Sequence, residues 1–403
     1  MKVLLINNFH YHKGGSEAVY FNTAELLKKE GHKVVFFSIR REENDPCEQE
    51  IYFAKKSSPF SKIRNYFNNP NAAKQLAKLL EVEKPDIAHV HLFWGGITPS
   101  IFKVLKKYDV PVVHTAHDYR MVCPAYTFRN GRGNVCEHCK GGRFEQCIKY
   151  RCSKGSIVQS IIMALEMKYR NIKWHPAKEL DGIIYVSEFS KQKHEEMDPL
   201  FAKTKNIVLY NTTSIGKLYP MKEKDSGYYL FYGRLSKEKG VASLVEAFIK
   251  LSGLRLKIIG TGPNEKELKQ NMYPNIEFLG YKKGDDLFNL VRNARFVIIP
   301  SEWYENNPMT IIEAYTLGVP VIGARIGGIP EIVEHGKTGF LFESRNVNAL
   351  VEAIKCSFIL DDKEYVIMKT NAKTFADINF NSDIYVNRLL DFYKETLVSI
   401  NKC

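Results

Sequence analysis

The segment Pro300–Gly323 joins two carboxylates to the start of a helix. Glu305 lies in an expected loop, and Glu313 lies about two turns into the helix after an Asn-Asn-Pro turn, so both carboxylates can face one cleft. The N-terminus of that helix offers unpaired N–H groups and a positive dipole end. We therefore expect the carboxylates to hold hydroxyl groups and the backbone amides to bind a diphosphate. Two such glutamates alone are weak evidence, because surface helices carry similar pairs by chance.

Two further loops of the second half carry residues suited to a diphosphate. The motif GRLSKEKG holds Gly233, Arg234 and Lys239, and an Arg fork with a Lys point charge can clamp two phosphates. Taken alone, the motif is more typical of a turn with solvated charges. Gly260 and Gly262 form a second turn, where a missing side chain allows close approach of a nucleotide, although strand-to-helix turns need glycine anyway.

The first half offers one glycine loop and one histidine at a strand end. The motif KGGSE precedes an expected helix and forms a candidate anion-binding loop, with Gly14, Gly15, Ser16 and Glu17. His117 ends an expected strand and should face the ligand edge of the first sheet. An isolated histidine at such a position is more often structural, but its place at that edge favours a functional role.

Five of the eight cysteines fall within 30 residues of sequence and suggest a metal site. Cys136 and Cys139 form a CxxC pair, and such clustering in a cytosolic chain favours zinc over disulfides. Reduced free thiols are the alternative. A zinc ion would hold together a loop, 121–154, that has little apolar content of its own.

Short apolar strands alternate with helical segments along most of the chain, which predicts an α/β fold with parallel sheets. The expected strands are Lys2–Asn7, Lys33–Ser38, Ile87–His91, Val112–Thr115, Gly182–Val186, Tyr228–Tyr232, Leu256–Ile259, Arg295–Ile299 and Val319–Ile322. The helices expected in the second half are Val241–Leu251, Asn264–Asn271, Pro308–Leu317 and Val347–Phe358. We expect a doubly wound domain over residues 1–210, with a cysteine-rich insertion at about 119–155, and a second one over 228–380. Residues 211–227 lack periodicity and are interpreted as a linker. Residues 381–403 are expected to form a helix that packs back toward the first domain.

Helices are expected at Ser16–Glu30, with Ser16 as the N-cap, and at Ser156–Tyr169. The second of these is apolar enough to lie in a membrane interface, although Ile157, Ile161, Met163 and Leu165 favour a buried packing face.

Composition describes a globular protein with an uneven charge. The chain carries 44% apolar and 26% charged residues, without a secretory signal or a stretch long enough to span a bilayer, so we expect it in the cytoplasm. Most of the net charge of +13 falls in residues 1–210, which hold 33 Lys and Arg against 22 Asp and Glu. A basic half favours a polyanionic partner, namely nucleic acid, an anionic membrane face or a phosphorylated substrate, whereas a lysine-rich soluble surface is the alternative.

The motifs together resemble those of retaining glycosyltransferases of the GT-B fold, family 4. GRLSKEKG, the Glu305–Glu313 spacing and the KGGSE loop carry the resemblance, and the pattern GGIPEIV at 327–333 agrees with it. The likeness extends over nearly the whole chain and implies two Rossmann-like domains, of which the first would bind the acceptor and the second a nucleotide-diphosphate sugar as donor. It also implies cell-surface polysaccharide synthesis.

The resemblance also implies roles for individual residues. Arg234 and Lys239 would bind the donor diphosphate, Glu305 the sugar and Glu313 the ribose. Further donor contacts would come from the amides of Met309 and Thr310, from Asn307 and from the glycine turns, and His117 would approach the sugar from the first domain. Many relatives have glycine after the first Glu, where this chain has Asn306, and a side chain there could alter donor choice.

Similar transferases with an inserted cysteine segment suggest a structural zinc site. Its ligands would be Cys123, Cys136, Cys139 and Cys152, with Cys147 as an alternative to Cys123. No catalytic metal is expected, because Arg234 and Lys239 would stabilise the charge of the leaving group.

The acceptor is expected to be a saccharide, free or on a lipid carrier, with peripheral contact to the inner face of an anionic membrane. A nucleotide-sugar epimerase or phosphorylase of the same fold is the alternative enzyme. A zinc-containing nucleic-acid-binding protein is a distant third interpretation, since the basic residues are scattered and form no aromatic-rich stripe.

Overall fold

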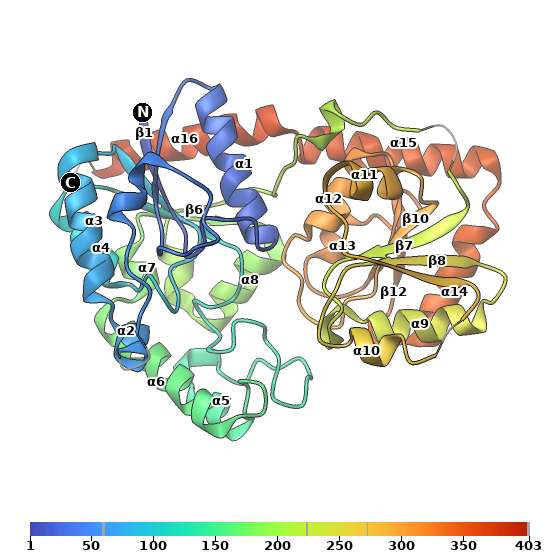
Figure 1. Cartoon of the computed structure of the whole chain (residues 1–403), viewed down its shortest axis with the longest axis horizontal. Helices are drawn as coiled ribbons and strands as arrows, with labels where there is room; N and C mark the ends of the chain where they lie inside the picture. The colour runs from blue at the N-terminus through green and yellow to red at the C-terminus, as the bar shows by residue number, and fades with distance from the viewer. Residues whose placement is uncertain (59–60, 223–224, 272, 401–403) are drawn as a thin grey trace. The chain divides into compact units, whose positions relative to one another are not determined.

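The computed structural model describes residues 1–58, 61–222, 225–271 and 273–400, and the chain divides into two compact units. Unit 1 comprises Met1–Leu209 and the chain from Asp383, and unit 2 comprises Tyr210–Ser382. Each unit contains one six-stranded parallel sheet, which confirms the predicted α/β class (Figure 1). Parts of two expected segments, residues 223–224 of the linker and 401–403 of the last helix, lie outside the described residues.

The sheet of unit 1 has the strand order β2-β1-β3-β4-β5-β6. Its strands are β1 Lys2–Ile6, β2 Lys33–Phe37, β3 Ile87–Val90, β4 Val112–Ala116, β5 Gly182–Tyr185 and β6 Asn206–Val208. The helices of this unit are α1 Gly15–Lys29, α2 Lys62–Phe67, α3 Pro70–Glu83, α4 Ser100–Lys107, α5 Glu145–Lys149, α6 Ile157–Lys173, α7 Pro176–Glu179 and α8 Glu188–Met197.

The last helix, α16 Ser382–Ile400, completes the core of unit 1 (Figure 1). Leu389 and Tyr393 are fully buried against strand residues such as Val3 and Val113. The backbone of Gly182 in β5 makes room for this helix, because a Cβ there would lie 2.8 Å from the ring of Phe392. Unit 1 is therefore built from both ends of the chain.

The sheet of unit 2 has the strand order β12-β11-β10-β7-β8-β9. Its strands are β7 Tyr228–Tyr232, β8 Arg255–Ile259, β9 Ile276–Gly280, β10 Phe296–Ile299, β11 Val321–Ala324 and β12 Gly339–Phe342. Its helices are α9 Val241–Lys250, α10 Glu265–Leu268, α11 Gly284–Arg292, α12 Met309–Thr316, α13 Ile329–Ile332, α14 Val347–Phe358 and α15 Asp362–Asn379.

Alternation along the central strands of unit 2 supplies two apolar layers, one on each face of the sheet. Tyr229 and Phe231 of β7 pack in a cluster with residues of α9 and α14, whereas Leu230 packs on the opposite face with residues of α12 and α15. The strands are hydrophobic on both faces for this reason.

Two local expectations in unit 1 are wrong. The N-cap of α1 is Gly14 and not Ser16. The expected packing face of α6 is turned outward, since Ile157, Ile161 and Leu165 are exposed by 48%, 36% and 52% and Met163 is half-buried. Within the described ranges, no helix combines the length and the apolar character that crossing a bilayer requires.

Candidate active site

Unit 2 brings Lys239 and Glu305 together because they follow neighbouring strands. Lys239 ends the loop after β7, and Glu305 lies in the loop after β10, which pairs with β7 in parallel. The carboxyl ends of the two strands therefore meet at one edge of the sheet. The Nζ atom of Lys239 lies 2.7 Å from Oε1 of Glu305, and the hydroxyl of Ser301 donates to the same oxygen at 2.6 Å.

This contact keeps a buried carboxylate charged. Glu305 is only 6% exposed. Burial raises the pKa of its carboxyl, but the Lys239 ammonium and the hydrogen bonds from Lys239 and Ser301 outweigh burial, so the pKa lies below its ordinary value. The second partner, Ser301, was not identified from the sequence, although it lies only two residues beyond the end of β10.

Two glycines allow this close assembly of loops. Gly240 has φ +66°, and a Cβ there would lie 1.8 Å from the carbonyl oxygen of Pro300. Gly327 has φ +62°, and a Cβ there would lie 2.4 Å from the carbonyl oxygen of Glu305. The motifs GRLSKEKG and GGIPEIV thus fix the loop that carries Glu305 from two sides.

Glu313 occupies a different environment from Glu305. It lies in α12, and the hydroxyl of Tyr232, the last residue of β7, donates to its Oε2 atom at 3.0 Å. Removal from water raises the pKa of the Glu313 carboxyl to about 7, and the Tyr232 hydrogen bond offsets only part of this shift. The two carboxyl groups of the segment thus have pKa values displaced in opposite directions, as is common where paired groups have distinct tasks.

The start of α12 leaves hydrogen-bonding capacity for a ligand. Its N-cap, Pro308, provides no side-chain acceptor, so the first-turn amides of Met309 and Thr310 receive no side-chain cap. Asn307 is 5% exposed and accepts a hydrogen bond from the amide of Asn211 at 2.8 Å, while its own Nδ2 has no partner among the described residues. A buried amide donor of this kind is suited to an acceptor oxygen of a ligand.

The other residues expected to bind the donor differ in their surroundings. Arg234 is exposed, and its guanidinium makes no hydrogen bond or ion pair with the described residues. Gly260 and Gly262 instead have a packing role, because a Cβ at either position would lie within 2.3 Å of a carbonyl oxygen of the 233–235 loop. Gly233 itself has φ +151°, which L side chains rarely adopt.

The glycine loop of unit 1 contains its own anion. Glu17 is 3% exposed, and its Oε1 atom accepts hydrogen bonds from Ser16 at 3.1 Å and from Asn7 at 3.4 Å. Gly14 and Gly15 are exposed. In the described arrangement the Glu17 carboxylate, rather than an external phosphate, lies beside this loop, which weakens the interpretation as an anion nest.

His117 belongs to a stack of neutral imidazoles at the ends of β3 and β4. Its Nε2 lies 2.9 Å from Nδ1 of His91, and His91 stacks on His89 with ring centroids 4.3 Å apart. Burial lowers the pKa of His117 to about 3, so its ring is neutral at physiological pH. Sequence reasoning missed His91, although its place directly after β3 was a usable signal.

The five clustered cysteines line one small cavity, but their arrangement gives the zinc prediction no support. Cys123, Cys136, Cys139, Cys147 and Cys152 are all free thiols around that cavity. Across the ranges that the structure describes, no group of three or more His, Cys, Asp or Glu side chains is placed to hold a metal ion. Thiols are suitable zinc ligands by chemistry, and the zinc site stays a prediction.

Comparison with known proteins identifies the family of this chain. Residues 13–213 match the model "Glycosyltransferase Family 4", and residues 220–375 match "Glycosyl transferases group 1". An uncharacterized glycosyltransferase of Methanocaldococcus jannaschii is 33% identical over 93% of each chain. The chain belongs to the family 4 glycosyltransferases.

Two further comparisons describe the relatives of this transferase. An uncharacterized 42.6 kDa protein in the cps region of Klebsiella pneumoniae is 27% identical, over 98% of this chain and 100% of that protein. The solved structure of HepE from Anabaena, in complex with UDP-glucose, superposes with a TM-score of 0.66 at 18% identity, over 99% and 100% of the two chains. This likeness establishes the GT-B fold of the transferase.

Proposed function

We propose that the transferase moves a sugar from a nucleotide-diphosphate donor to a saccharide or lipid-linked saccharide acceptor, with retention, in the synthesis of a cell-surface polysaccharide. The observation that carries the proposal is the placement of Lys239 and two differently ionised carboxyl groups at one end of the unit 2 sheet. The cps-region relative supports the polysaccharide assignment, and the UDP-glucose bound by HepE makes UDP-hexoses the first donors to test.

Each residue of the site is given one task in this proposal. Exposed Arg234 and the Lys239 ammonium bind the diphosphate, Glu305 accepts hydrogen bonds from the sugar hydroxyls, and Glu313 accepts them from the ribose. The uncapped first turn of α12 and the free Nδ2 of Asn307 donate to the remaining oxygens.

Proton transfer in the proposed reaction needs no nucleophile from the protein. The acceptor hydroxyl attacks the anomeric carbon from the face of the leaving diphosphate, the C–O bond to that diphosphate breaks, and a phosphate oxygen takes the hydroxyl proton. Arg234 and Lys239 stabilise the negative charge that develops on the leaving group. His117, neutral at physiological pH, acts as a hydrogen-bonding group.

The identity of the donor is tested by thermal denaturation with a panel of nucleotide sugars. A ligand that binds only the folded protein raises the melting temperature, so we expect one UDP-sugar to shift it more than UDP alone. Nucleotide release measured with and without acceptor then separates transfer from epimerase or phosphorylase activity. An unchanged melting temperature with every nucleotide sugar would contradict the proposal.

The Arg234→Ala variant tests the proposed leaving-group contact. Because Arg234 is exposed, its removal should leave folding intact and lower kcat by about 100-fold, since the contact stabilises developing charge. Arg255→Ala is the control on the same unit, because Arg255 is also exposed but begins β8 and so lies at the opposite edge of the sheet. A variant at 234 that changes only KM would contradict the assigned role.

A further inference from the structure

Helix α6 of unit 1 has the reverse of the usual amphipathic arrangement. A surface helix normally buries its apolar stripe and exposes its polar residues. In α6 the buried residues include Ser160, Glu166 and Arg170, whereas Ile157, Val158 and Leu165 are exposed. The apolar stripe of this helix is therefore left uncovered by the residues of its own unit that the structure describes.

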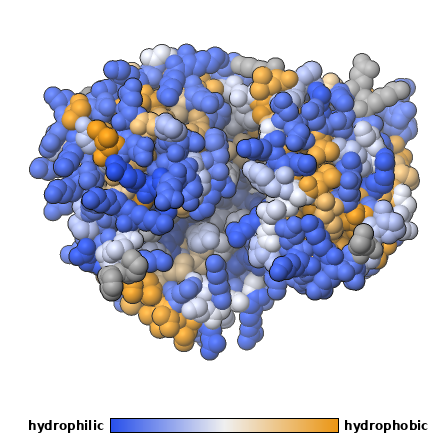
Figure 2. Space-filling model, viewed as in Figure 1, coloured by the Kyte–Doolittle hydropathy of each residue, from blue (hydrophilic) through white to orange (hydrophobic). Residues whose placement is uncertain are grey.

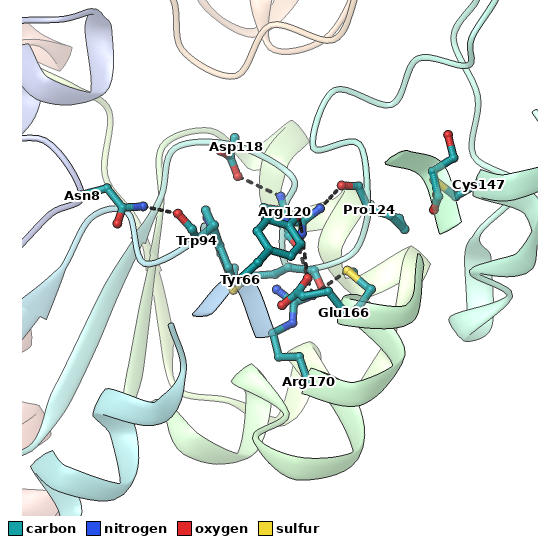
Figure 3. Close-up of polar contacts among 12 residues, drawn as sticks. Asn8, Tyr66, Trp94, Asp118, Arg120, Pro124, Cys147, Glu166 and Arg170 are labelled. Carbon is teal, nitrogen blue, oxygen red and sulfur yellow. Dashed lines mark hydrogen bonds and ion pairs between the residues drawn. The ribbon is translucent and has the colours of Figure 1, made fainter. Parts of the chain in front are cut away.

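The inner face of α6 is fixed by a buried ionic network (Figure 3). The Nη2 atom of Arg120 lies 2.6 Å from Oε2 of Glu166, and both side chains are about 5% exposed. The same nitrogen donates to the hydroxyl of Tyr66 at 2.6 Å, and Nη2 of Arg170 donates to the carbonyl of Arg120 at 3.1 Å. Turning the helix over would carry Glu166 to the surface and leave the buried Arg120 guanidinium without its carboxylate, which is strongly unfavourable. The outward direction of the apolar stripe is thus enforced.

The stripe runs along the whole outer face of the helix. At 100° per residue, five exposed apolar side chains fall on one side of α6. They are Ile157, Val158, Ile161, Leu165 and Ile172, with exposed fractions of 48%, 62%, 36%, 52% and 74%. Figure 2 shows an apolar patch at the lower edge of the molecule, where Figure 1 places α5 and α6.

Positive charge is concentrated in α6 and in the segment that precedes it. Between residues 140 and 173 seven Lys and Arg side chains are exposed, against the single exposed carboxylate of Glu145. The seven are Lys140, Arg143, Lys149, Arg151, Lys154, Lys168 and Lys173. Lys168 lies within the stripe itself, where a long side chain can extend its ammonium to a polar headgroup while its methylenes remain in apolar surroundings.

The neighbouring helix α2 continues the same surface chemistry. The rings of Phe67 in α2 and Tyr169 in α6 meet with centroids 5.9 Å apart. Helix α2 also exposes Ile63, by 63%, between exposed Lys62 and Arg64. An apolar residue between cations thus recurs beside α6.

We propose that the outer face of α6 docks on the interface of an anionic lipid bilayer. The 17 residues of the helix are too few to cross a membrane with their buried charges, but a helix lying in the interface needs only an apolar face and a cationic margin. A second copy of the chain is a poorer occupant, because a two-fold contact would bring the same cations together. Anionic headgroups neutralise them instead.

The docking surface is connected to the acceptor-binding unit through Arg120. The backbone amide of Arg120 donates to Oδ1 of Asp118 at 2.8 Å, and Asp118 directly follows His117 (Figure 3). Helix α6 is thereby tied to the end of β4. In this respect the inference rests on the proposed function, since an acceptor carried by a lipid diphosphate would be presented at the same interface.

Cosedimentation with vesicles tests the docking surface directly. We expect the full chain to bind vesicles of phosphatidylcholine with 30% phosphatidylglycerol, and to bind pure phosphatidylcholine at least about tenfold more weakly, because each cation near the surface adds to the attraction. High salt should release the protein. The double variant Val158→Asp/Leu165→Asp should bind at least about tenfold more weakly than wild type.

A matched control carries the same charge change elsewhere. Val366→Asp/Ile367→Asp alters two exposed apolar residues of α15, 52% and 58% exposed, in unit 2. It should bind vesicles as wild type does. Both variants should keep the melting temperature and its shift by donor, which separates a failed docking surface from a failed donor assignment.

Three results would overturn the inference. The first is that wild-type protein does not bind anionic vesicles. The second is that the Val158→Asp/Leu165→Asp variant binds them as strongly as wild type does. The third is a change of oligomeric state in that variant alone, seen by analytical ultracentrifugation without vesicles, which would make a second copy the occupant of the α6 face.

Discussion

At the scale of single residues, the site depends on keeping two carboxyl groups in different protonation states. The contact with Lys239 keeps Glu305 ionised, whereas removal from water raises the pKa of Glu313 to about 7, so that its carboxyl is partly protonated at neutral pH. At neutral pH only the second arrangement costs the folded state free energy, because the pKa of Glu313 is raised, whereas the lowered pKa of Glu305 favours the folded state. The two carboxyl groups can therefore be tested separately.

The pKa of about 7 for Glu313 predicts pH-dependent donor binding. A carboxylate accepts ribose hydroxyls better than a carboxylic acid does, so affinity should increase as pH rises from 6 to 8. Stability should change in the opposite direction. The folded protein binds the proton more tightly than the unfolded chain, so the folded state loses roughly 3 kcal/mol between pH 4.5 and 7 and no more above that range.

Glu313→Gln provides the control, because it removes the titration and preserves the shape. Calorimetric titration of the donor at several pH values should show a flat profile for this variant between pH 6 and 8. A wild-type affinity that does not change across this interval would show that ionised Glu313 has no part in donor binding.

Removing Lys239 should affect stability and activity in separable ways. Lys239→Met leaves the buried Glu305 carboxylate unpaired, and we expect a loss of about 3–5 kcal/mol in the free energy of unfolding together with a loss of transfer. Adding Glu305→Gln removes the unpaired charge and should recover most of the stability but none of the activity. Urea denaturation and initial rates measure the two effects, and recovery of transfer in the double variant would refute a direct role of Lys239.

At the scale of elements, the cysteine segment places five free thiols around one small cavity. Burial raises the pKa of Cys123 to about 11 and also raises that of Cys139, so few thiolates exist at neutral pH. Cys356 is exposed and lies outside this segment. Thiol chemistry can therefore distinguish the segment from the rest of the chain.

We expect iodoacetamide at pH 7.5 to modify Cys356 well before any of the five clustered cysteines, as followed by mass spectrometry of peptides. Rates with and without a chelator should agree. Faster labelling of the clustered cysteines after chelation would instead indicate a bound metal and would support the zinc prediction.

At the scale of the whole molecule, the two ends of the chain share one core. Leu389 of α16 is fully buried in the apolar cluster of unit 1, so Leu389→Ala should cost about 2–5 kcal/mol. The loss should fall on unit 1, so a donor that binds unit 2 should still shift the melting of that unit. Ile384→Ala, at a residue of the same helix that is 46% exposed, is the control and should be nearly neutral. Equal effects of the two variants would contradict this account of the core.

The sequence predicted the fold class correctly because the evidence for it is local. Alternating apolar strands and periodic helices predicted the two doubly wound units, and the bounds expected for β7, Tyr228–Tyr232, agree with the structure at both ends. The strands β6, β9 and β12 were missed, and all three are edge strands; β6 and β9 are mostly half-buried and lack the continuous apolar run of a central strand. The long helix α15 was missed as well, for its apolar residues are sparse.

Residue types and spacing alone determined which groups bring chemistry to this protein, and the tertiary structure decided which of them meet. Glu305, Lys239 and Arg234 were named from motifs. Lys239 and Glu305, however, are 66 positions apart in the sequence, and their contact depends on β7 lying beside β10. The same holds for α6. Its apolar residues favoured a buried face from the sequence alone, and only the buried pair of Arg120 and Glu166 shows that the stripe faces outward. A pattern shows that one side of a helix is apolar, whereas what covers that side is set by partners distant in sequence.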